Sequence, residues 1–251
     1  MQASTRNDGL EALGRMVYPG RVIIIGKTLS GDIPFVTYCI TGRSPSSQAR
    51  RIVFEGTRAM VRPTEEDALK EGDPELLLYP AIMILQGIAV SNGRQTSSIR
   101  PSAGPMGPVE ILAQAMEDWD YEPDSPNFTP RISGCVMSSD RAALSIIKRG
   151  SGGHSIKSYF EFPLQPGRAK MISTYSGENV NPLPSFRGEP QDLRLGETTA
   201  GKTAEAVYEA MAPADPKEDF RVATVCVYLH ELRTDVFEKA VINRHERKDD
   251  E

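Results

Sequence analysis

The sequence predicts an α+β fold in which two mainly antiparallel β-sheets stack face to face, with a helical layer on each outer side. The first observation is the order of segments: a group of strands, a helix, a second group of strands, a helix and a last strand. Parallel α/β folds alternate strands and helices more strictly. The second observation is that every segment carries an apolar face. A four-layer αββα sandwich buries all of these faces.

The N-terminal half contains the first group of strands. Val22 to Ile25 is a β-branched run stopped by Gly26, and a second run covers 35–40, with a Ser30-Gly31-Asp32 turn between them. This pattern predicts a β-hairpin. Further strands are expected at 52–54, 59–61, 76–85 and 88–90, the last followed by the turn signal Ser91-Asn92-Gly93.

The first helix is predicted to start at Pro108, a residue that suits the first helical position. One face then carries apolar residues at helical spacing: Ile111, Leu112, Ala115, Met116 and Trp119. A second group of strands is expected at 132–137, 142–148, 155–162 and 170–175. Residues 177–196 are polar and rich in Pro and Gly, which predicts a long loop.

A second helix is expected after Thr203, which can cap it, with Pro213 ending it. Ala204, Val207, Tyr208 and Met211 fall on one face of this helix. Residues 221–232 form the last predicted strand. The chain shows no short-period repeat and no clear linker, so we expect a single domain over 16–242. The polar leader 1–15 and the charged tail 243–251 are expected to be flexible termini.

Composition excludes several classes of protein. The net charge is -5 and no basic stripe is visible, so nucleic acid is not an expected partner. No apolar run is long enough to span a bilayer, and the N-terminus has no secretory hydrophobic region. Cys39, Cys135 and Cys226 each lie in an apolar run, which favours buried reduced thiols in a cytoplasmic protein. The three histidines form no cluster, so no metal site is predicted.

The loop between the first helix and the next strand, residues 121–132, is the most informative segment. It holds three prolines, and each fixes its own φ and restricts the residue before it. Glu122 is one of those restricted residues. A stiff loop with a carboxylate and a guanidinium a few residues apart can hold a reacting group still. The alternative is a proline-rich surface connector.

Residues 196–203 match the P-loop pattern in full, with Lys202 as its lysine. A working P-loop also needs a buried strand entering the loop, and 189–195 makes a poor one. No apolar run ending in Asp offers a magnesium ligand further on. A loop followed by a helix cap is therefore the favoured interpretation. P-loop nucleotide hydrolysis is kept as the less favoured function.

The segment from Gly42 to Arg51 is rich in arginines and hydroxyls beside a strand end. Such groups can grip a phosphate through charge-assisted hydrogen bonds. The alternative is a solvated polar loop. Tyr79, inside an apolar run, is by composition more often a core tyrosine than a catalytic one.

Taken together, several segments resemble the archaeal-type IMP cyclohydrolases and their bacterial relatives. They are Tyr18-Pro19-Gly20-Arg21, Gly42-Arg43-Ser44, Tyr79-Pro80-Ala81-Ile82, Ser91-Asn92-Gly93, Tyr121-Glu122-Pro123-Asp124 with Asn127 and Thr129-Pro130-Arg131-Ile132, then Ile172-Ser173-Thr174-Tyr175 and residues 181–188. The resemblance covers roughly residues 16–235, and the joint order of the segments is its most specific feature.

The resemblance implies a four-layer fold like that of the N-terminal-nucleophile hydrolases. It implies no self-cleavage, because Met16-Val17-Tyr18 offers no Cys, Ser or Thr nucleophile. The implied reaction is closure of 5-formamidoimidazole-4-carboxamide ribotide to IMP with loss of water. Such a reaction needs a base for the amide proton and a cation or donors for the oxyanion. No metal or organic cofactor is implied, and the partner is a small purine nucleotide.

The resemblance also assigns site residues. Glu122 is the implied base or proton shuttle, Arg43 with Arg50 the implied cation, and Tyr79 a donor to the substrate. Residues expected to line the pocket or bind ribose and phosphate are Ser44, Asn92, Gly93, Thr96, Tyr121, Asn127, Arg131, Thr174 and Tyr175.

One position departs from the family pattern. Gln48 stands where some members carry an arginine. If that arginine is the catalytic cation, Arg50 replaces it or the chemistry is lost. A purine-nucleotide-binding protein without cyclohydrolase activity is therefore the main alternative function. A homo-oligomer is compatible with this size and class, although no interface patch is visible.

Overall fold

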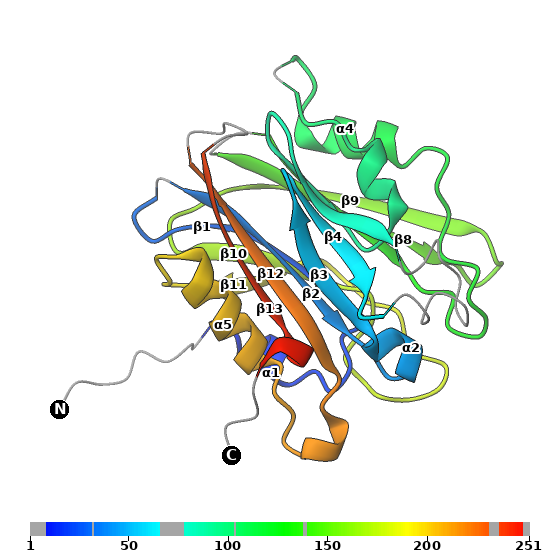
Figure 1. The fold of residues 1–251 in the computed structure, drawn as a ribbon. Coiled ribbons are helices and arrows are strands. Elements are labelled where there is room, and N and C mark those ends of the chain that lie inside the picture. Colours follow the sequence, from blue (N-terminus) through cyan, green and yellow to red (C-terminus); the bar gives the residue numbers. More distant parts are fainter. Residues whose placement is uncertain are drawn as a thin grey trace.

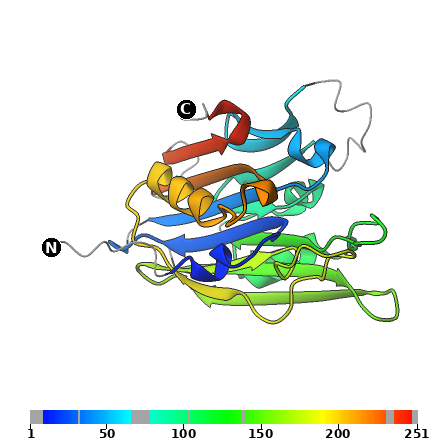
Figure 2. The same ribbon diagram turned by 90° about the horizontal axis from the view of Figure 1, so that it is seen from below.

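The computed structural model describes residues 9–31, 33–65, 78–102, 104–137, 140–230 and 236–247. Two antiparallel sheets stack face to face, and helices cover their outer faces (Figure 1). This arrangement confirms the predicted four-layer α+β sandwich. In the view from below, the α5 helix lies across the strands of the six-stranded sheet (Figure 2).

The six-stranded sheet has the strand order β11-β10-β1-β2-β12-β13. Its centre is the predicted hairpin, with Ile24 opposite Thr37. Its strands are β1 (Arg21–Lys27), β2 (Pro34–Thr41), β10 (Arg168–Ser173), β11 (Gln191–Arg194), β12 (Arg221–Leu229) and β13 (Phe237–Asn243).

The seven-stranded sheet is a meander in which each strand pairs with the next along the chain. Its strands are β3 (Arg50–Glu55), β4 (Arg58–Pro63), β5 (Tyr79–Ile84), β6 (Ile88–Ser91), β7 (Arg131–Val136), β8 (Arg141–Arg149) and β9 (Ser155–Pro163). The predicted strand over 76–85 thus begins at Tyr79, and residues 76 and 77 lie outside the described part.

The alternation of side chains along β1 explains how the layers form. Ile23 and Ile25 point between the sheets, whereas Val22 and Ile24 point toward the outer helical layer. Successive strand residues face opposite sides. Since both sides are covered by other layers, both sets are apolar and fully buried. The uninterrupted β-branched run at 22–25 follows from this double burial.

Each sheet has its own outer helix. On the six-stranded sheet, α5 packs over β12, β13 and β2, and its Val207 lies in the apolar cluster on that face. On the seven-stranded sheet, Leu112 of α4 and the following Met116 pack over β7 and β8. The helices are α1 (Glu11–Gly14), α2 (Pro45–Gln48), α4 (Pro108–Ala115) and α5 (Ala200–Ala210), with 3-10 turns η2 (Arg94–Ser98), η3 (Pro216–Glu218) and η5 (Arg244–Glu246).

The expectation of a frayed leader over 1–15 is wrong for its second half. Leu10 and Leu13 are buried in the apolar cluster beneath α5, because α1 presents them to that helix. In the tail, Asn243 is buried and Arg247 pairs with Glu205 and Glu209. Residues 1–8 and 248–251 lie outside the described part of the chain.

Three further predictions need correction. The loop expected over 177–196 contains β11, a short edge strand that buries only Leu193 and so carries no periodic apolar signal. The α5 helix is capped by Thr199 rather than Thr203, which is buried within it. β13 was not predicted, because most of its side chains are only half buried at the sheet edge.

Cys39, Cys135 and Cys226 are buried free thiols, as expected. Among the described residues, none of the helices is both long and apolar enough to cross a membrane.

Candidate active site

A polar pocket of about 300 Å³ opens where strand ends of both sheets meet. This volume is at the lower end of the range usual for small-molecule sites, about 300–1,000 Å³. Its walls come from the residues flanking β1, the α2 turn, the first residue of β3, the loop before β7 and the segment after β10. The lining residues are Tyr18, Arg21, Arg43, Ser44, Ser46, Ser47, Arg50, Glu122, Asp124, Asn127, Thr129, Tyr175 and Leu183.

The proline-rich loop forms one wall and is fixed by its own hydrogen bonds. The Glu122 amide donates to the Thr129 carbonyl at 2.9 Å, and the Thr129 amide donates to Asp124 Oδ1 at 2.6 Å. Phe128 adopts a left-handed φ of 47°, and its ring lies 4.0 Å from the Arg149 guanidinium. A bulky residue holds this conformation only where its surroundings determine it. The loop is therefore rigid and holds Glu122 in one position, rather than acting as a surface connector.

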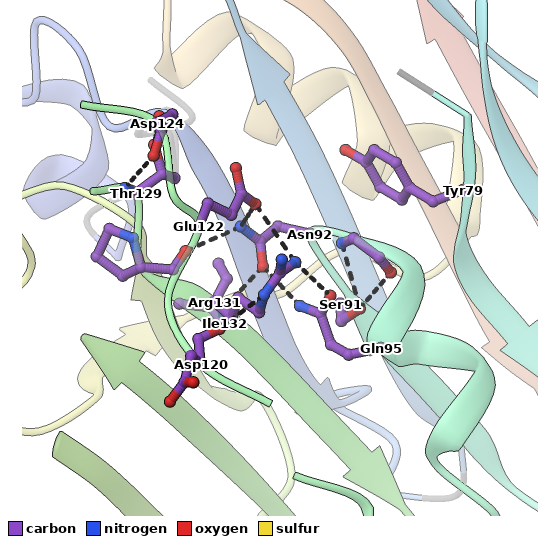
Figure 3. Close-up of polar contacts among 12 residues, drawn as sticks. Tyr79, Ser91, Asn92, Gln95, Asp120, Glu122, Asp124, Thr129, Arg131 and Ile132 are labelled. Atoms are coloured by element: carbon purple, nitrogen blue, oxygen red, sulfur yellow. Dashed lines mark hydrogen bonds and ion pairs between the residues drawn. The ribbon is translucent and has the colours of Figure 1, made fainter. Parts of the chain in front are cut away.

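Glu122 points from this loop into the interior and is only 2% exposed. Asn92 Nδ2 donates to its Oε1 at 3.4 Å, and Arg131 Nη1 lies 3.7 Å from the same oxygen (Figure 3). Burial raises the pKa of Glu122 above its ordinary value, although Arg21 and Arg131 oppose the rise. A buried carboxyl with a raised pKa can exchange a proton nearer to neutral pH than an exposed one.

The sequence suggested that Asn92 lines the pocket. In the structure it does not line the pocket, and its side chain contacts Glu122. Its Oδ1 accepts from the Ile132 amide at 2.8 Å and from Gln95 Nε2 at 3.0 Å. Its Nδ2 donates to the Pro130 carbonyl at 2.9 Å. One buried amide thus joins the turn after β6 to the start of β7 and to the carboxyl (Figure 3).

Two of the three arginines that line the pocket have partners within the protein. Arg43 Nη1 donates to Asn179 Oδ1 and to the Val180 carbonyl, both at 3.1 Å, and its guanidinium lies over the Tyr18 ring. Arg50 donates to the Ser47 carbonyl at 2.8 Å and is almost wholly buried. Burial lowers the pKa of Arg50, and the nearby Arg21 adds to this effect.

Arg21 is the third lining arginine, and sequence reasoning gave it no role. Its Nε is buried without a hydrogen-bond partner among the described residues. Burial alone lowers the pKa of Arg21, but Glu122 and nearby tyrosine hydroxyls outweigh burial and raise it well above its ordinary value. Its place at the first residue of an apolar strand, within Tyr18-Pro19-Gly20-Arg21, was the available signal.

Tyrosine hydroxyls surround the interior end of the pocket. Tyr79 is buried, and its hydroxyl lies 2.8 Å from that of Tyr38, a residue that sequence reasoning missed. Figure 3 shows the Tyr79 hydroxyl directed toward the side on which Glu122 lies. Tyr175 shares a hydrogen bond of 2.6 Å with Thr129 Oγ1, and burial raises its pKa to about 12. Burial also raises the pKa of Tyr38, so the Tyr38 and Tyr175 hydroxyls stay protonated at neutral pH and can donate hydrogen bonds.

We expect the Tyr38–Tyr79 pair to be coupled in stability. Either single change to Phe leaves one buried hydroxyl without its partner, at a cost of about 1–3 kcal/mol, whereas removing both hydroxyls costs less than the sum. Urea unfolding of Y38F, Y79F and the double variant measures this coupling as a double-mutant cycle. Additive losses would mean that the hydroxyls do not interact.

The structure sorts the predicted site residues into three groups. Glu122, Arg43, Arg50, Ser44, Asn127 and Tyr175 line the pocket. Asn92 and Arg131 lie behind this lining and contact Glu122. Tyr79 does not line the pocket, and its hydroxyl pairs with that of Tyr38.

The third group was expected to contact the ligand, and the structure gives its members supporting contacts elsewhere. Thr96 donates to the Gly93 carbonyl within the turn after β6. Tyr121 donates to the Gly153 carbonyl in the β8–β9 turn. Thr174 Oγ1 accepts from the Arg21 amide at 3.1 Å. The pocket lining includes none of the described residues Gly93, Thr96, Tyr121 and Thr174. The side chains of the last three instead form hydrogen bonds with backbone groups.

Sequence reasoning also missed Tyr18, Ser46, Ser47, Asp124, Thr129 and Leu183 as lining residues. All lie within or beside motifs that the sequence singled out. Leu183 lies in the predicted long loop. The Leu183 amide donates to Asn127 Oδ1 at 3.0 Å. The loop is therefore tied to the pocket wall by residues distant in sequence.

Gln48, at the position that departs from the family pattern, does not line the pocket. Its Nε2 donates to the Gly42 carbonyl at 3.2 Å and so helps to close the α2 turn. Arg50, two residues on, supplies a guanidinium to the pocket instead.

The P-loop-like segment forms no part of this pocket. It follows the edge strand β11, and Thr199 Oγ1 accepts from the Lys202 amide as a helix cap. The Lys202 side chain is exposed on α5, outside the six-stranded sheet. These contacts match the helix-cap interpretation of the segment.

Comparison with known proteins gives consistent matches. The family model described as "IMP cyclohydrolase-like protein" matches residues 18–231. An IMP cyclohydrolase of Methanococcus maripaludis strain C7 is 28% identical over 193 residues, which is 76% of this chain and 85% of that protein. The IMP cyclohydrolase of strain S2 is 27% identical over 223 residues, covering 83% of this chain and all of that protein. The chain belongs to the IMP cyclohydrolase-like protein family.

Proposed function

We propose that this protein closes the ring of 5-formamidoimidazole-4-carboxamide ribotide to give IMP and water. The observation that carries the proposal is Glu122, a buried carboxyl with a raised pKa that lines a polar pocket beside three arginines. The matching relatives are named IMP cyclohydrolases, which supports the same reaction here.

The reaction joins the carboxamide nitrogen to the formyl carbon within one molecule. Glu122 takes a proton from the carboxamide nitrogen while the new C–N bond forms and the formyl oxygen becomes an oxyanion. The formamido nitrogen then loses its proton, and the oxygen leaves as water with the two protons. A rigid pocket lowers the barrier further by holding the two arms of the substrate together.

The rest of the lining suits a ribotide. Ser44, Ser46 and Ser47 present hydroxyls beside Arg43, which is a donor set that suits a phosphate. Asn127 and Tyr175 stand near the opposite wall with groups that can bind ribose hydroxyls. The ribotide would then lie with its phosphate at the α2 turn and its base near Glu122.

The decisive experiment is an ultraviolet assay of ring closure with the purified protein, together with calorimetric titration of IMP. We expect turnover and IMP binding. Binding of IMP without turnover would instead identify a purine-nucleotide-binding protein, the function that Gln48 keeps open. Neither binding nor turnover would remove both proposals.

Lys202→Ala tests the P-loop alternative. Because Lys202 is exposed on the outer helix, away from the pocket, we expect the affinity for IMP and the rate of ring closure to remain as in the wild type. Titration calorimetry and the same absorbance assay measure both. A loss of nucleotide affinity in this variant would restore the P-loop hypothesis.

A further inference from the structure

Hydrogen bonds to Thr174 and Thr41 fix the backbone at Gly20 and Arg21. Its amide donates to Thr174 Oγ1 at 3.1 Å, and its carbonyl accepts from the Thr174 amide at 2.9 Å. The preceding Gly20 has a φ of 76°, and its carbonyl accepts from the amide and the hydroxyl of Thr41. A Cβ at Gly20 would lie 2.1 Å from Thr174 Oγ1. The chain therefore enters β1 in one fixed direction.

That direction sends the Arg21 side chain into the space between the sheets. Residues at every second position of a strand share a face, and Ile23 and Ile25 of β1 point into the core between the sheets. Arg21 has the same parity and lies at the strand end, where that space becomes the pocket. The fold thus presents a guanidinium to the interior at the position where an apolar residue would otherwise continue the core.

The guanidinium of Arg21 differs from the other two in the pocket. Arg43 Nη1 donates to the Asn179 side chain and the Val180 carbonyl, and Arg50 donates from Nε and Nη2 to backbone carbonyls. No hydrogen bond or ion pair of the Arg21 side chain occurs within the described part of the chain, and its Nε is buried without a partner. A buried donor left unpaired destabilises the fold, so a fold that keeps one beside a pocket is explained most simply by a ligand that pairs with it.

We infer that Arg21 is the catalytic cation of the site: it lines the same pocket as Glu122 and stabilises the oxyanion that forms on the formyl oxygen. The inference rests on the proposed ring closure. It transfers to Arg21 the role that the resemblance suggested for Arg43, whose guanidinium instead donates hydrogen bonds to Asn179 and Val180.

The electrostatic surroundings of Glu122 support this role. The charged groups that face it are Arg21 from β1, Arg50 from β3, Arg131 from β7 and Asp124 from its own loop. Arg21 opposes the rise in the pKa of Glu122 more than the other cations do. A phosphate suits this place poorly, because a dianion would lie against the Glu122 carboxylate, whereas an oxyanion forms only after Glu122 has taken up a proton. The serine-lined α2 turn remains free for the phosphate.

The test compares Arg21→Gln with Arg21→Lys, and with Arg58→Gln as a control because Arg58 is exposed on β4. For R21Q we expect kcat to fall by about 10²–10³-fold, as when an oxyanion-hole donor is removed, with a smaller change in KM. The acid limb of its kcat/KM profile should move to higher pH, because the cation that opposes protonation of Glu122 is gone. For R21K the charge remains, so the acid limb should stay in place while kcat falls less than in R21Q.

A ¹³C titration of the Glu122 carboxyl by NMR, assigned by its loss in Glu122→Gln, gives a readout that needs no turnover. We expect the pKa of Glu122 to rise in R21Q and to stay unchanged in R21K and R58Q. Unchanged kcat and an unchanged Glu122 titration in R21Q would overturn the inference, and so would a raised KM with normal kcat. If R21Q does not fold, R21K decides: normal kcat with raised KM would again assign Arg21 to phosphate binding. If the wild type fails to turn over but R21Q still shifts Glu122, ring closure is wrong and the Arg21–Glu122 pairing stands.

Discussion

Glu122→Gln is expected to lower kcat for ring closure by about 10²–10⁴-fold, which is the usual contribution of a general base. The amide has nearly the same shape and keeps an acceptor for Asn92 Nδ2, which now donates to Glu122 Oε1. It cannot take the proton from the substrate carboxamide. Binding of IMP should therefore persist, because the pocket keeps its shape and its other donors. The ultraviolet assay and calorimetric titration measure the two properties separately.

The pH profile gives a second measure of the same residue. A base must be ionised to act, so activity of the wild type should fall as the pH falls through the pKa of Glu122. Burial raises that pKa, so the acid limb should lie above the ordinary glutamate value of about 4.3. Glu117→Gln, an exposed change just after α4, should leave both rate and profile as in the wild type. Turnover at the wild-type rate in E122Q would remove Glu122 as the base.

Asn92→Ala is expected to have the largest effect on stability. The change leaves the buried Ile132 amide and Pro130 carbonyl without their present partners. Each such unpaired group costs about 1–3 kcal/mol, so the free energy of unfolding should fall by about 2–6 kcal/mol. Glu122 also loses a donor to its ionised form. Its pKa should rise further, and the acid limb of kcat/KM should move to higher pH.

Asn243→Ala is a matched control for this prediction. Asn243 is likewise a buried amide that bridges backbone groups, since its Oδ1 accepts from the Ile52 amide and its Nδ2 donates to the Ile52 carbonyl. Within the described part of the chain it forms no hydrogen bond with Glu122, and it does not line the pocket. Urea unfolding should show a comparable loss of stability, while the pH profile stays in place. A shift of the acid limb in both variants would mean that general loosening, rather than the Asn92 contact, moves the pKa.

The strands and helices could be predicted where apolar residues follow a clear pattern along the segment. The run at 22–25 is apolar throughout because both faces of β1 are buried. The α4 helix is apolar on one face because only that face is buried. The two edge strands β11 and β13 escaped prediction for the opposite reason. An edge strand is half solvated and makes a weaker periodic pattern, so its pairing is visible only once the neighbouring strand is in place.

Part of the candidate site was likewise visible in the sequence. Prolines that restrict their neighbours predicted a stiff loop carrying Glu122, and the structure shows the backbone contacts that hold it. Arg43, Ser44 and Arg50 were expected in the pocket because arginines and hydroxyls cluster beside a strand end, and they line it. Arg21 lies within a motif that the sequence singled out, but it was given no role because nothing in the sequence shows that its side chain points into the pocket rather than to the surface.

The sequence by itself determined three features of this protein. The pattern of apolar residues determined the layers, the prolines determined the rigid loop that carries Glu122, and the order of the motifs indicated the family. All three are visible in the chain without its tertiary structure. Only the tertiary structure decided which groups meet. Arg21 and Glu122 lie far apart in the chain, and they share a pocket because two sheets stack and bring the start of β1 beside the loop before β7. The same stacking turned Asn92 and Thr174 from expected ligand contacts into supports, since the direction of a side chain depends on the packing around it.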